Sequence, residues 1–109
     1  MAIDLRAVSS FPYFHTIASL SETNALEIKL PPEAGKISIG CELDKIFVYQ
    51  NGLTDGAVVS GSENHAFIPA ANFLPIGLGK GSTRAQSIFL ASAESTAAVK
   101  VSIILEEKT

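Results

Sequence analysis

The feature that most constrains this chain is an alternation of apolar and polar residues with a period of two. It is clearest over residues 26–30, 37–41 and 99–105. Because successive side chains of a β-strand point to opposite faces, each segment predicts a strand with one buried face. In the last segment Ile104 adds an apolar residue on the second face, which indicates a central strand or one covered by a partner.

Shorter apolar runs extend this pattern. Four further strands are predicted over residues 46–49, 57–59, 66–68 and 88–91, and residues 13–17 and 73–78 are weaker candidates. Asn51-Gly52 favours a type I′ hairpin, because both central positions of that turn need a positive φ. Seven or eight short strands separated by turns predict an all-β fold, an antiparallel sandwich of jelly-roll-like type.

Residues 1–20 differ from the rest of the chain. They alternate poorly and carry a cluster of aromatic residues, Phe11, Tyr13 and Phe14. We therefore expect an irregular N-terminal arm over residues 1–20 and a β-sandwich domain over residues 21–109. The total length fits a single domain.

Charge is scarce in this chain, at 17% of residues, against roughly 25% in an average soluble domain. The eight Lys and Arg are scattered singly, whereas binding to a phosphate backbone depends on clustered cations. No nucleic-acid partner is expected. The longest uncharged stretch, residues 64–79, contains two prolines and two glycines, so no spanning helix and no membrane partner are expected.

The glycine-rich segment 77–83 has some likeness to a phosphate-binding loop. Such a loop needs Gly-Lys followed directly by Ser or Thr and then a helix, but here Gly81 follows Lys80. We expect a hairpin loop instead. In it, Lys80 and Arg84 would form a small basic contact point for a carboxylate on a partner.

The sequence offers little for catalysis. Metal sites of jelly-roll oxygenases combine two His with a carboxylate, but Phe67 stands where a second ligand after His65 would be, and His15 is far away in the sequence. No G-x-S-x-G elbow occurs, and Cys41, the only cysteine, is expected to be a buried, inert thiol. We expect no enzyme activity, no metal and no cofactor. A metal-dependent enzyme would need both histidines in one site.

The shortage of charge is local. From residue 46 to 79 only Asp55 and Glu63 are charged. Buried strands explain such a stretch, and so does a surface covered by another chain, since interface cores are depleted of charge and enriched in aromatics. On the second explanation the interface residues come from the arm and the uncharged stretch: Phe11, Tyr13, Phe14, Phe67, Ile68, Phe73, Leu74 and Ile76.

Five segments carry a resemblance to a known class of protein: KISIG at 36–40, KIFVYQNG at 45–52, FIPA at 67–70, IFLASA at 88–93 and VKVSIILE at 99–106. With the arm before them, they resemble the small β-sandwich structural proteins of tailed-bacteriophage virions. The resemblance implies a capsid decoration (cement) protein in the virion, assembled in the host cytoplasm. It further implies a homo-oligomer, often a trimer, that bridges subunits of the major capsid protein.

Two other functions stay open at this point. One is another virion component, such as a tail, adaptor or fibre-associated protein. The other is a ligand- or glycan-binding jelly-roll module, with Tyr13, Tyr49, Gln50 and Asn51 as candidate contacts. In the assembly hypothesis the arm lies across a shell subunit, so deletion of residues 1–14 is expected to abolish binding and leave the sandwich folded.

Overall fold

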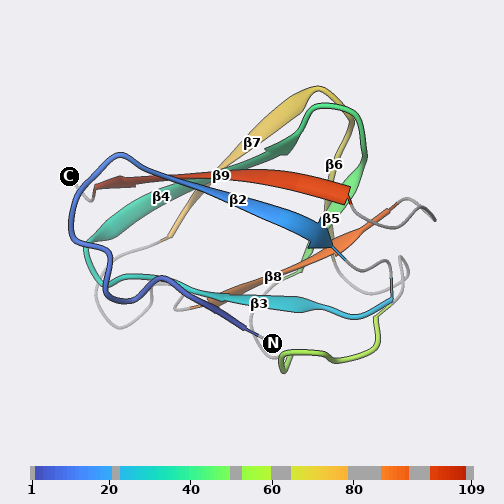
Figure 1. Ribbon diagram of the computed structural model, residues 1–109, viewed down its shortest axis with the longest axis horizontal. Helices are drawn as coiled ribbons and strands as arrows, with labels where there is room; N and C mark the ends of the chain where they lie inside the picture. Colours follow the sequence, from blue (N-terminus) through green and yellow to red (C-terminus); the bar gives the residue numbers. More distant parts are fainter. Residues whose placement is uncertain are drawn as a thin grey trace.

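The chain folds into two packed β-sheets in the computed structural model, which describes residues 2–20, 23–49, 53–59, 65–78, 87–93 and 99–107. These residues form no helix (Figure 1). The five-stranded sheet has the order β1-β3-β8-β5-β6 and the four-stranded sheet the order β2-β9-β4-β7. All pairs are antiparallel except β1–β3. The predicted antiparallel β-sandwich is confirmed.

The strands match most of the predicted segments. They are β1 (Ile3–Asp4), β2 (Tyr13–Leu20), β3 (Leu26–Lys29), β4 (Ala34–Cys41), β5 (Ile46–Tyr49), β6 (His65–Ile68), β7 (Asn72–Gly77), β8 (Ser87–Ser92) and β9 (Val99–Glu107). The predicted strand at 57–59 is reduced to an isolated bridge between Val58 and Asn24. The Asn51-Gly52 turn lies outside the described residues.

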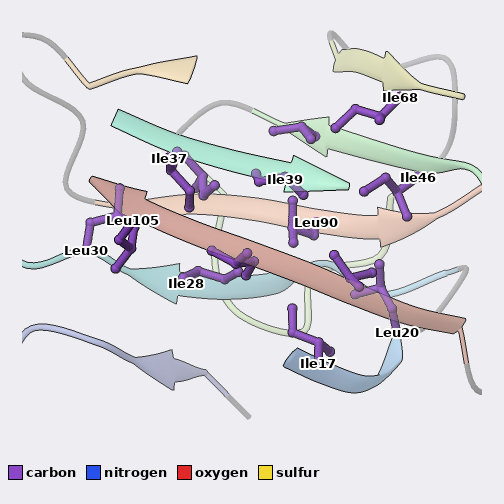
Figure 2. Close-up of a cluster of buried hydrophobic side chains, with 14 of the residues drawn as sticks. Ile17, Leu20, Ile28, Leu30, Ile37, Ile39, Ile46, Ile68, Leu90 and Leu105 are labelled. Atoms are coloured by element: carbon purple, nitrogen blue, oxygen red, sulfur yellow. The ribbon is translucent and has the colours of Figure 1, made fainter. Parts of the chain in front are cut away.

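Alternate residues of the two sheets build one core between them. Figure 2 shows these side chains pointing into the space between the strands. Fully buried examples are Ile28, Ile37, Ile39, Ile46, Leu90, Val101, Ile103 and Leu105. Burial of each such side chain contributes about 1.5–3 kcal/mol relative to an exposed one. The period of two in the sequence therefore reflects the burial of alternate residues in this main core.

A second, smaller core lies on the outer side of the five-stranded sheet. There the segment 53–59 runs beside residues 23–25, and the N–H of Ala25 donates to the carbonyl of Ala57 at 2.9 Å. This contact brings Val59 over the outward side chains Tyr49 and Phe89, which are buried. Strand β5 is consequently buried on both faces, and its lack of charge is explained by packing within the chain.

The prediction of an irregular arm over residues 1–20 is wrong, because both ends of this segment form strands. Strand β1 pairs with β3, and β2 pairs with β9 from Tyr13 to Ile17 and again at Leu20, so the irregular stretch between these two strands is residues 5–12. Leu5 belongs to the main core and is 4% exposed. The alternation in β2 is weak in the sequence because its inward positions begin with Tyr13 and His15 and its register shifts between Ile17 and Leu20. The arm therefore belongs to the sandwich and cannot be removed without disturbing it.

Candidate interaction surfaces

The outer side of the four-stranded sheet is a continuous surface, which we name the open face. Cross-strand register places its residues in rows. One row contains Phe14, Ile104, Ser38 and Pro75, and the next contains Thr16, Ser102, Gly40 and Phe73. Apolar and small side chains thus fill the middle of this face from edge to edge.

Two phenylalanines dominate the open face. Phe14 on β2 is 70% exposed and Phe73 on β7 is 48% exposed. They stand on opposite edges of the sheet, one row apart along the strands and three strand spacings, or about 14 Å, apart across it. Between them Ile104 of β9 is only half-buried. A soluble monomer rarely leaves such a contiguous apolar area uncovered unless the area is a binding site.

Charge on the open face lies toward its ends. In the row beyond Phe14, the Nζ of Lys36 is 3.3 Å from a carboxylate oxygen of Glu106. At the other end of β9, Lys100 is exposed. Both partners of the Lys36–Glu106 pair are half exposed to solvent, so the pair adds little to stability. An apolar centre with charged ends is the usual anatomy of a protein interface.

An aromatic cluster lies on the outer side of the five-stranded sheet. The ring centroids of Phe47 and His65 are 4.4 Å apart in an edge-on arrangement, and Phe67 is 5.8 Å from Phe47. Tyr49 is 5.8 Å from His65. Phe67 is 48% exposed and forms the outer limit of this cluster.

A groove of about 450 Å³ opens between the two sheets along β2. Its lining is mostly apolar and comes from β1, β2, β3 and the segment 53–59: Ile3, Thr16, Ile17, Ala18, Ser19, Leu20, Asn24, Ala25, Leu26, Asp55 and Gly56. The N–H of Glu27 donates to the Asp55 carboxylate at 3.0 Å. This hydrogen bond lowers the pKa of the Asp55 carboxyl, so the groove carries a negative charge at neutral pH.

The other ionisable groups do not assemble into a reactive site in the part of the chain that the structure describes. Among those residues no group of three or more His, Cys, Asp or Glu could hold a metal ion. His15 lies on the inner side of β2 and His65 on the outer side of β6, so they belong to different sheets. Asp4 and Arg6 form an exposed pair at 2.6 Å, and the hydrogen bond from Arg6 lowers the pKa of Asp4.

The candidate interface residues from the sequence are divided among several places. Phe14 and Phe73 both lie on the open face, at its opposite edges, while Phe67 lies on the outer side of the other sheet. Ile68 is 1% exposed and belongs to the core, so it is not available on the surface. The remaining four are partly buried and pack against the core: Phe11, Tyr13, Leu74 and Ile76. Lys80 and Arg84 lie outside the described residues, as do Gln50 and Asn51.

The sequence missed the part that backbone geometry plays in the open face. Gly40 lies beneath the ring of Phe73, because a Cβ at this position would be 2.6 Å from two ring atoms. The only sequence feature that pointed to this face was Ile104, the apolar residue on the second face of β9.

The described residues include no helix that is long and apolar enough to cross a membrane.

Comparison with known proteins identifies no relative of this chain. No protein-family model matches the chain, and no curated protein or solved structure is significantly similar to it. Any function therefore rests on the surfaces described above.

Proposed function

We propose that this chain is a non-enzymatic structural subunit of a virion, most specifically a capsid decoration (cement) protein. It forms homo-oligomers, in the simplest case a trimer, and bridges subunits of the shell. One observation carries the proposal: the open face, with Phe14, Ile104, Pro75 and Phe73 in neighbouring rows. The assignment to a virion rests on the resemblance of the strand segments to phage structural proteins.

The physical reason is the free energy of covering this face. Phe14 is the more exposed of its two phenylalanines, and full burial of a phenylalanine side chain stabilises a complex by about 1.5–3 kcal/mol. The central strands between the phenylalanines hold small residues, Ser38 and Ser102, which let a partner approach closely. A flat, weakly charged face of this kind favours a protein partner of similar shape.

The two outer sides of the sandwich are suited to different roles. On the five-stranded sheet, the chain's own segment 53–59 already packs over Tyr49 and Phe89. On the four-stranded sheet, Phe14 and Phe73 remain exposed. Association through the open face would therefore bury Phe14 and Phe73.

The test is the mass of the protein in solution. We expect the wild type to sediment as an oligomer and the double variant Phe14→Ser/Phe73→Ser to sediment as a monomer that keeps the β-sheet signal in circular dichroism and a cooperative unfolding transition. Leu43→Ser is the matched control, because Leu43 is 84% exposed and lies in the turn between β4 and β5, outside the paired rows of the open face. This control should remain an oligomer. A monomeric wild type, or a double variant that still associates, would refute the role of the open face.

Copy number separates a decoration protein from other virion components. A decoration protein covers the shell and should be present in purified virions in numbers comparable to the major capsid protein. A tail, adaptor or fibre-associated protein should be present in far fewer copies per virion, enough for one ring or a few rings of subunits. Quantitative mass spectrometry of purified virions distinguishes the two, and a ring-sized copy number would rule out the decoration role.

A ligand-binding role has one observation in its favour, the aromatic cluster around Phe47 and Phe67 on β5 and β6. Exposed aromatic rings are the usual platform for stacking sugars. In this case a glycan array should give hits that Phe67→Ala abolishes and Leu43→Ser leaves intact. An array without hits removes this second candidate.

A further inference from the structure

Four charged residues lie at the ends of the open face, two at each end, on or beside the central strands β9 and β4. At one end Glu106 of β9 pairs with Lys36 of β4. At the other end β9 carries Lys100, and Glu42 follows directly after the last residue of β4. Both are exposed, and the hydrogen bond from the Cys41 Sγ to the carbonyl of Lys100 places them at the same end. The order of charge across the two strands is therefore reversed from one end to the other.

The apolar residues of the open face are reversed in the same way. The row that contains Phe14 has its phenylalanine on the edge strand β2, whereas the next row has Phe73 on the other edge strand, β7. On β9 the apolar Ile104 stands in the first of these rows and the small Ser102 in the second. A face with this pattern can be complementary to itself, which is the property that a two-fold contact between identical chains requires.

We infer that the occupant of the open face is the open face of a second copy, turned end for end about a two-fold axis that crosses the strands. Strand β9 of one copy then runs antiparallel over β9 of the other, with Glu106 toward the partner's Lys100. In the same way Lys36 lies toward the partner's Glu42. The two-fold axis makes each of these contacts occur twice.

The apolar centre fits the same arrangement. Packed sheets lie about 10 Å apart with their strands within about 30° of each other, so residues close to the axis stay near their counterparts. Ile104 then meets the partner's Ser102, an apolar side chain against a small one, and the contact covers Phe14 and Phe73 of both copies. Opposite charges at the ends and apolar contact at the centre act together.

Charge favours this orientation over a two-fold axis that runs along the strands. The second orientation would place each end of the face over the same end of the other copy. Among the described residues, one end carries three glutamates against one lysine, and the other end has two acidic and two basic residues: Glu33, Glu106, Glu107 and Lys36 against Glu42, Asp44, Lys45 and Lys100. Turning the copies end for end keeps the two acidic ends apart, because like charges brought together across an interface oppose binding.

This inference rests on the open face being the association surface, as proposed above, and replaces the trimer named there by a dimer. A two-fold contact closes with two copies, whereas a trimer joins two unlike surfaces of each chain. The mass of the assembly therefore separates the two arrangements.

The first measurement is sedimentation velocity of the full-length wild type over a concentration series. We expect an equilibrium between monomer and dimer, without a trimer. A trimer would overturn the two-fold contact and leave the proposed association surface standing, and a monomer at every concentration would overturn both. A dimer in solution that is missing from purified virions would leave this inference intact and overturn the proposed function.

Charge reversal tests the orientation of the two copies. Lys100→Glu places a negative charge beside the partner's Glu106 and, because the contact occurs twice, should raise the dissociation constant of the dimer by about tenfold or more. The double variant Lys100→Glu/Glu106→Lys exchanges the two charges without changing the net charge, and it should restore the dimer. The control is Lys29→Glu on β3 of the other sheet. It changes the net charge as Lys100→Glu does and should leave the dissociation constant unchanged.

Salt distinguishes repulsion from misfolding. At about 1 M salt the screening length falls to about 3 Å, so Lys100→Glu should regain much of its association, with the same circular dichroism spectrum as the wild type. Two results would overturn the inference. One is a Lys100→Glu variant that dimerises as well as the wild type. The other is loss of the dimer in Lys100→Glu/Glu106→Lys together with its recovery in Lys100→Glu/Glu42→Lys, which would show that the copies are turned about the other axis.

Discussion

Gly40 shows how a single residue determines the shape of the open face. It lies on β4 opposite Phe73, and a Cβ at this position would be 2.6 Å from the carbonyl oxygen of Asn72 as well as from the Phe73 ring. The backbone oxygen cannot move without shifting β7. Glycine therefore allows the Phe73 ring to pack against residue 40 while the ring stays 48% exposed.

We predict that Gly40→Ala destabilises the protein by about 1–3 kcal/mol, the cost of overpacking a well-packed position. Gly77→Ala is the matched control, since Gly77 lies on the paired strand β7 and a Cβ there would meet nothing within 4 Å. The control should be neutral or stabilising by up to about 1 kcal/mol, because alanine is favoured over glycine in a strand. Urea unfolding of the two variants measures the difference. Equal unfolding midpoints for the two variants would show that β7 shifts to accommodate the added methyl group at little cost.

At the scale of elements, the N-terminal strand β1 and the segment after it are a structural part of the sandwich. The N–H of Leu5 donates to the carbonyl of Lys29 at 2.9 Å, and the Leu5 side chain lies in the main core with Ile3 packed beside it. This segment connects β1 and β2, which belong to different sheets. It therefore ties the two sheets together on the side of the groove.

We predict that Leu5→Ala costs about 2–5 kcal/mol, as is usual for a buried leucine, and that deletion of residues 1–12 destabilises the protein by more. Val8→Ala is a milder control, because Val8 is only partly buried against the same core. Thermal and urea unfolding measure these effects. A truncated protein as stable as the wild type would mean that residues 1–12 only lie on the surface, as the sequence suggested.

The sequence predicted those elements whose period of two comes from a single buried face. Strands β3, β4 and β9 are of this kind, because the outer side of each has charged or small residues, apart from Ile104 of β9. It could not decide whether residues 46–79 are core or interface, since β5 is covered by the segment 53–59 and this contact joins parts of the chain that lie apart in sequence. It also could not assign Ile68 and Phe67 to opposite sides of one strand without the register of β6 against β5.

At the scale of the whole molecule, Cys41 reports on the opening of the sandwich. It is the only cysteine, it is buried at the end of β4, and its Sγ donates to the carbonyl of Lys100 at 2.6 Å. A reagent can reach it only when the structure around this end of β4 opens. Labelling of this thiol therefore measures how often this end of the four-stranded sheet opens.

We predict that Ellman's reagent labels Cys41 slowly in the native protein and at once in denaturant. Leu5→Ala should label faster than the wild type, because it lowers the free energy of unfolding, whereas Leu43→Ser should label at the wild-type rate. Absorbance of the released thiolate gives the rate directly. Immediate labelling of the native protein would show that the β4–β9 contact opens without global unfolding.

The position of β9 has a consequence for how the chain acquires its fold during synthesis. This strand is made last among the nine described, yet it lies in the middle of its sheet, between β2 and β4. Its pairing joins Tyr13 to Leu105, so β2 must wait for almost the whole chain before it finds its neighbour. Contacts of such long sequence separation make folding slow. Until β9 leaves the ribosome, the edges of β2 and β4 that pair with it have no strand beside them, and this interval is when the nascent chain most needs protection from aggregation.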